Sequence, residues 1–134
     1  MSGPHINLLA AWTGILLGLG SGAVLGLGFQ RADWLGGYQS FRRRLYRLGH
    51  ISFFGLALLN LAFFLTVRVL SLNGVAVDCA SVCFVVGAIT MPFFCGLMAH
   101  FPGTHSWFVI PVGSLLTAGV LTVWKVIEQG WRSS

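Results

Sequence analysis

The chain has 134 residues, of which 56% are hydrophobic and only 8% are charged, and its formal net charge is +5. A soluble domain carries roughly 25% charged residues, so this chain has too few to cover a water-exposed surface. The composition predicts an integral membrane protein. It excludes a secreted disulfide scaffold, a nucleic-acid-binding domain and most soluble enzymes. Because four spans of about 20 residues each would use most of the chain, we expect a single domain over residues 1–134.

Four long apolar runs follow one another along the chain, at residues 6–29, 48–70, 75–99 and 107–127. Each is long enough to cross a hydrocarbon layer of roughly 30 Å as a helix. Lipid offers no partner to backbone N–H and C=O groups, so such runs must be helical. Short connections containing Asn73-Gly74 and Pro102-Gly103 separate the last three runs. The sequence therefore predicts an all-α fold, with four transmembrane helices in an up-and-down antiparallel bundle.

The distribution of positive charge predicts the orientation in the membrane. Five of the eight basic residues lie on or beside the connection between the first two runs, and three lie on the other side. Since positively charged loops stay cytoplasmic, we expect this connection inside the cell and both termini on the non-cytoplasmic side. Apolar residues recur at helical spacing among its arginines, which predicts a short basic amphipathic segment lying at the lipid headgroups. A connection that only fixes the topology is the simpler alternative.

The first run contains a row of small residues at four-residue spacing. The members of this row are Ala10, Gly14, Gly18, Gly22 and Gly26. In a helix this spacing lines up one face, and small residues on it let a second helix approach closely within a membrane. We expect the row to be a helix-packing surface, either inside the bundle or against another subunit.

The third run carries sulfur-containing residues at the same spacing, among them Cys79, Cys83, Met91 and Cys95. Thiolate and thioether groups select Cu(I), but buried cysteine also packs as a small hydrophobic residue, which is the simpler interpretation. Asn60 lies near the middle of the second run, where we expect it to hydrogen-bond to a neighbouring helix and contribute about 1 kcal/mol. An alternative function follows from these residues: a small oligomeric transporter or channel for a small solute or a soft metal ion.

Three of the four histidines are expected at the cytoplasmic end of the bundle. His50 begins the second run, His100 ends the third, and His105 follows the Pro102-Gly103 turn. A b-type haem needs two imidazoles from different helices at one depth, space for its flat ring, and cations for its propionates. We therefore predict haem b between His50 and His100, with His105 as a reserve ligand.

Residues near these histidines suit the predicted haem site. Gly96 precedes His100 by one helical turn, which leaves room for a macrocycle, and Arg43 and Arg47 lie where propionates would emerge. Two alternatives stay open at this place. The histidines can be interfacial residues that bond only to backbone or headgroups, or they can border a pocket for a quinone or a lipid headgroup.

The chain offers no arrangement typical of an enzyme. Its three acidic residues lie near the ends of the apolar runs, and no nucleophile with an oriented base is evident. We therefore expect a non-enzymatic accessory subunit of a larger respiratory or photosynthetic membrane complex, which transfers electrons if it holds the haem. The expected partners are the lipid bilayer and other integral membrane subunits, and nucleic acid is not expected.

Overall fold

The computed structural model describes residues 3–133. The long helices are α1 (Gly3–Leu27), α2 (Phe41–Val69), α3 (Val75–His100) and α4 (Val109–Ser133). Two short 3-10 helices lie in the connections, η1 (Trp34–Gly36) and η2 (Pro102–Phe108). The described residues contain no strand, and the four long helices are long and apolar enough to cross a membrane. The all-helical prediction is confirmed.

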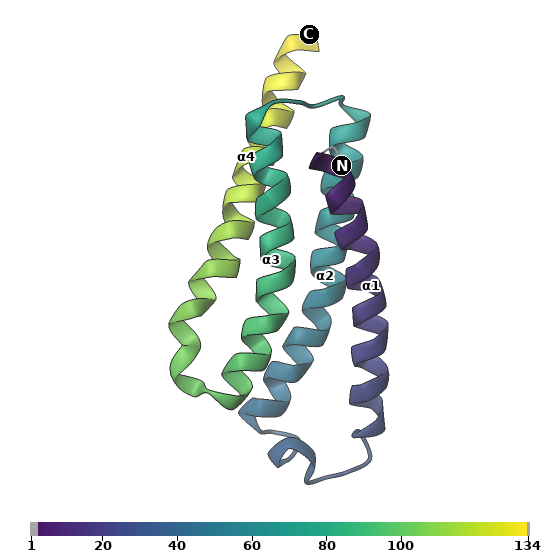
Figure 1. Ribbon diagram of the computed structural model, residues 1–134, viewed down its shortest axis with the longest axis vertical. Coiled ribbons are helices and arrows are strands. Elements are labelled where there is room, and N and C mark those ends of the chain that lie inside the picture. The colour runs from purple at the N-terminus through teal and green to yellow at the C-terminus, as the bar shows by residue number, and fades with distance from the viewer. Residues whose placement is uncertain (1–2, 134) are drawn as a thin grey trace.

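The four long helices stand side by side and alternate in direction along the chain (Figure 1). α1, α2 and α3 contact one another, whereas α4 makes its extensive contacts with α3 and not with α1. α1 and α4 therefore occupy the outer positions of the row in Figure 1. Both termini lie at the end opposite the α1–α2 connection. The predicted alternation is present, but α4 lies beside the group formed by α1, α2 and α3 and does not close a ring with α1.

The start of α2 differs from the prediction. We expected a helix from residue 48 with a separate amphipathic segment before it, but α2 begins at Phe41. The cause is a cap, because the Ser40 hydroxyl accepts a hydrogen bond from the backbone N–H of Arg43. The arginine-rich residues therefore form the first turns of α2 and continue directly into its apolar part. α4 likewise extends beyond the predicted end at residue 127, to Ser133.

The glycine row of α1 packs against α2 within the chain. A Cβ atom placed on Gly14 would lie 3.1 Å from the Cβ of Ala57, and one on Gly18 would lie 2.8 Å from the ring of Phe54. A Cβ atom on Gly26 would meet nothing within 4 Å. The sequence allowed this row to pack either inside the bundle or against another subunit. The structure shows packing inside the bundle, and Gly26 takes no part in it.

A cluster of buried apolar residues lies toward the end of the molecule that holds the two termini. It joins α2, α3 and α4 and includes Phe63 and Phe84, whose ring centroids lie 5.1 Å apart. Val67, Val77 and Ala118 belong to the same cluster and are buried. The opposite end, where α2 begins and α3 ends, holds most of the positive charge, and cavities lie at both ends.

We predict that Gly18→Leu destabilises the protein. The new side chain has no room against the ring of Phe54, and overpacking of this kind lowers the free energy of unfolding by about 1–3 kcal/mol. The measurement is the thermal unfolding midpoint in detergent, followed by fluorescence-detected size-exclusion chromatography. Gly20→Leu is the matched control, because a Cβ atom on Gly20 meets nothing within 4 Å. Equal midpoints for the two variants would contradict this account of the row.

Candidate functional site

The side chain of His50 points from α2 toward α1. Its Nδ1 atom lies 3.0 Å from the Oγ atom of Ser21. The Ser21 hydroxyl also lies 3.1 Å from the carbonyl oxygen of Gly18, to which it can donate its one hydrogen. When it does so, Nδ1 is the donor in its bond to Ser21, and Nε2 of the neutral imidazole keeps a free electron pair. This is the tautomer in which Nε2 can bind a metal ion or accept a hydrogen bond.

Two close contacts fix the position of the His50 ring. A Cβ atom on Gly22 would lie 2.8 Å from Cε1 and 3.4 Å from Nε2, so the ring lies directly against the backbone of α1. Phe54 contacts the ring edge-on, with the centroids 5.5 Å apart. His50 is half-buried, and among the described residues its Nε2 atom has no hydrogen-bond partner.

A cavity of about 340 Å³ opens beside His50, between α1, α2 and α3. Gly49 and Gly96 border it from two different helices, and Ser21 and Tyr46 are among its few polar neighbours. Cavities that bind small ligands measure about 300–1,000 Å³, so this one is large enough for a ligand. The structure thus brings Gly96 and His50 to the same cavity. The sequence analysis did not identify Gly49 as a residue of this site, although Gly49 directly precedes His50.

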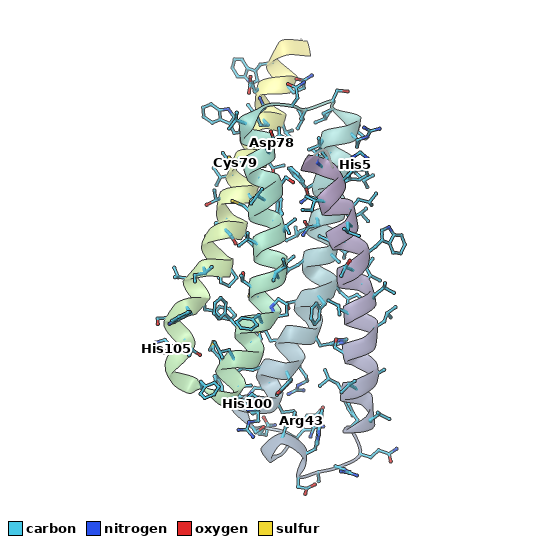
Figure 2. All side chains as sticks on the ribbon, in the orientation of Figure 1. His5, Arg43, Asp78, Cys79, His100 and His105 are labelled. Atoms are coloured by element: carbon cyan, nitrogen blue, oxygen red, sulfur yellow. The ribbon has the colours of Figure 1, made fainter. Side chains whose placement is uncertain are left out.

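His100 is not among the residues that border this cavity. It is exposed at the end of α3, and its Nε2 atom lies 2.7 Å from the hydroxyl oxygen of Tyr46. Tyr46 precedes His50 by one turn of α2, so His100 lies closer than His50 to the end of the helices. His105 is also exposed, on η2, and Figure 2 shows it near the start of α4, away from His100. The structure therefore does not bring the three histidines together.

The arginines of the predicted site lie on the same face of α2 as His50, at three and seven residues before it. Arg43 is only 3% exposed. Its guanidinium carbon lies 4.6–5.7 Å from the centroids of three aromatic rings, those of Phe29, Trp34 and Tyr38. One terminal nitrogen of Arg43, Nη2, is buried without a hydrogen-bond partner. Arg47 is half-buried and lies over the ring of Tyr38 at 5.1 Å.

A second polar cluster joins α1, α2 and α3 nearer the termini. Asn7 and Asn60 are fully buried, and the Asn7 amide donates to the Asn60 side-chain oxygen at 2.8 Å. The Ser81 hydroxyl donates to the Asn7 side-chain oxygen, and the Asn60 amide donates to the carbonyl oxygen of Leu56 at 2.9 Å. Asn60 therefore bonds across to a neighbouring helix. Its partner Asn7 was missed, because it lies at the very start of the first apolar run.

The cysteines do not gather into a site. Cys79 is exposed, Cys83 is half-buried and Cys95 is buried. Within residues 3–133, no three His, Cys, Asp or Glu side chains lie close enough together to hold a metal ion.

Comparison with known proteins adds no further constraint. No protein-family model matches the chain, and no curated protein or solved structure is significantly similar to it. The function is therefore inferred from the positions and contacts of the residues described above.

We predict that Asn60→Leu destabilises the protein. It removes the Asn60 oxygen that accepts from the Asn7 amide, which keeps its other hydrogen bond to the carbonyl oxygen of Ser81 at 3.1 Å. One buried N–H of Asn7 is then unsatisfied, which costs about 1–3 kcal/mol. The measurement is again the thermal unfolding midpoint in detergent. Thr66→Val is the control, because Thr66 donates only to the carbonyl oxygen of Ala62 in its own helix.

A double variant sharpens this test. Adding Asn7→Leu to Asn60→Leu removes the Asn7 N–H that the single variant leaves without an acceptor. The double variant should therefore lose less stability than the sum of the two single losses. Strictly additive losses would show that the two amides do not depend on each other.

Proposed function

We propose that the chain is an integral membrane protein whose four long helices cross the bilayer, with the arginine-rich end on the cytoplasmic side. The outer faces of α1 and α4 carry large exposed apolar side chains, such as Leu16, Val120 and Trp124. Continuous apolar surface of this extent is unusual on a protein surrounded by water and marks a face that meets lipid or another protein. The excess of arginine at one end supports the orientation.

We further propose that the protein is a non-catalytic subunit that holds a b-type haem, with His50 as the iron ligand from this chain. The observation that carries this proposal is the state of the His50 imidazole. Ser21 engages Nδ1, Nε2 has no hydrogen-bond partner among the described residues, and the His50 side chain borders a cavity. Haem-ligating histidines need this arrangement, in which the second ring nitrogen donates to a fixed acceptor and sets the tautomer.

The residues around the cavity fit a flat ring with acidic side groups. Gly49 and Gly96 add no side-chain bulk beside His50. Arg47 lies one turn closer to the end of α2 on the same face as His50, where a propionate would find a cation. His100 is the second ligand in this proposal, and its Nε2 atom would have to exchange Tyr46 for iron. A bound haem supplies one-electron chemistry.

Membership of a larger redox complex follows from the faces that the chain leaves uncovered. α4 packs along α3 and exposes the rest of its apolar surface, as α1 does on its outer side. Other membrane subunits can cover both faces. The transporter alternative has less support, because Asn60 is buried and hydrogen-bonded within the chain.

The test is an absorbance spectrum, before and after dithionite, of the protein purified gently from its native membrane. We predict a reduced b-type band in the wild-type protein and its loss in His50→Ala. His100→Ala should keep the haem but shift the band, because one axial ligand changes. His5→Ala is the matched control, since His5 lies at the opposite end of the molecule (Figure 2).

Two results would contradict the proposal. One is a colourless wild-type protein, and the other is a His50→Ala variant with an unchanged spectrum.

A further inference from the structure

Another cavity lies where α1 ends and its connection to α2 begins. It measures about 290 Å³, and its border combines apolar, aromatic and cationic side chains: Val24, Leu27, Gly28, Arg31 and Trp34. Gly28 makes this arrangement feasible, because a Cβ atom at that position would lie 2.4 Å from the indole of Trp34. The indole therefore rests against the end of α1, with Arg31 beside it and exposed apolar side chains above it.

The positive charge around this cavity exceeds the negative charge. Arg42 donates to the carbonyl oxygen of Ala99 and Arg44 to that of Gln39, so both bond to backbone groups. Asp33 is the acidic residue of the α1–α2 connection, but within residues 3–133 the one salt bridge joins Lys125 to Glu128, on α4. The five arginines at this end therefore form no salt bridge within the described residues and keep an excess of positive charge.

Arg43 has the strongest need for an anion. It is almost completely buried, its Nη2 atom has no hydrogen-bond partner, and three aromatic rings surround the cation. Aromatic faces attract a cation, but they cannot accept the hydrogen bonds of five N–H groups as an oxyanion does. Trp34 connects the two features, because it both borders the cavity and lies against Arg43.

We propose that this cavity binds the headgroup of an anionic phospholipid, with its phosphate on Arg31. Arg43 lies against Trp34 and does not border the cavity, so it adds a second positive charge nearby. An acyl chain then lies along Val24 and Leu27, which are 63% and 85% exposed. Charge complementarity selects this occupant, because a zwitterionic lipid or an apolar helix would leave the arginines uncompensated. The tryptophan beside the cavity fits the same depth, since indole rings gather at the lipid headgroups.

This inference rests on the membrane embedding in the proposed function and is independent of the haem. It assigns Arg31 and Arg43 to the lipid and leaves Arg47, on the side of His50, to the haem. Each of the two proposed sites can therefore be disproved without disproving the other. A colourless protein that still responds to anionic lipid would remove the haem and keep the lipid site.

The experiment measures the thermal unfolding midpoint in detergent, with phosphatidylglycerol or phosphatidylcholine added. We expect phosphatidylglycerol alone to raise the midpoint of the wild-type protein by several degrees, because a ligand that binds only the folded state stabilises it. Arg31→Gln should lose most of this shift, and Arg43→Gln should reduce it by less, because Arg43 does not border the cavity. Arg68→Gln should keep it, because Arg68 is exposed at the far end of α2.

Arg31→Gln protects the test against a folding defect in Arg43→Gln, since the Arg31 side chain is exposed. Inorganic phosphate forms a separate arm of the experiment. A full shift with inorganic phosphate would overturn the lipid assignment in favour of a free anion. The same phosphatidylglycerol shift in Arg31→Gln and Arg68→Gln, or equal shifts with both lipids, would overturn the site itself.

Discussion

Where α1 meets α2, the backbone of one helix lies against the side chains of the other, with Gly18 against Phe54 and Gly22 against His50. Because glycine has no side chain, the imidazole of His50 comes close to the backbone of α1 at Gly22 and within hydrogen-bonding distance of Ser21. When the Ser21 hydroxyl donates to Gly18, Nδ1 carries the proton in the bond to Ser21. In a membrane, close backbone contact of this kind is a main source of helix association, so the same contact that holds the two helices together also prepares the candidate ligand.

The two ends of the molecule are built differently. Toward the termini, the Asn7, Asn60 and Ser81 side chains satisfy one another, and the rings of Phe63 and Phe84 fill the core. A polar cluster of this kind fixes the relative positions of three helices, because sliding any one of them would strand a buried amide. The opposite end instead combines the cavity beside His50, the arginines of the α1–α2 connection and the unpartnered Nη2 atom of Arg43. Buried hydrogen bonds thus fix the helices toward one end, and the candidate ligand sites lie at the other.

The four helices were predictable from the sequence, because the length of an apolar run alone decides whether a helix can span a bilayer. The start of α2 was less predictable from the sequence, although Ser40 is a typical N-cap residue that could have indicated it. The depth of the histidines was also predictable to within about one turn. Their directions were not, since apolar residues surround these helices on every side, and the pattern does not show which face meets a neighbour.

The partner of Asn60 was not predictable either, because the sequence does not show which helix faces meet. The sequence predicts that a buried amide will find a hydrogen-bond partner, but only the packing of α1 on α2 and α3 selects Asn7. Arg43 is the opposite case. Its place in a basic cluster indicated an exposed cation at the headgroups, whereas the Trp34 and Tyr38 rings of the α1–α2 connection cover it. Ring contacts made by a connection of irregular structure leave no periodic signal in a sequence.

The contact between α1 and α2 can be measured directly by disulfide cross-linking in native membranes. The protein would carry Gly14→Cys and Ala57→Cys, its three native cysteines replaced by alanine, and a protease site in the α1–α2 connection. A Cβ atom placed on Gly14 would lie 3.1 Å from the Cβ of Ala57, so a small shift brings the pair to the separation of about 3.8 Å in a disulfide. We predict that oxidation joins the two fragments, while a Gly20→Cys and Ala57→Cys pair stays separate. Equal cross-linking of both pairs, or none in the first, would contradict the account.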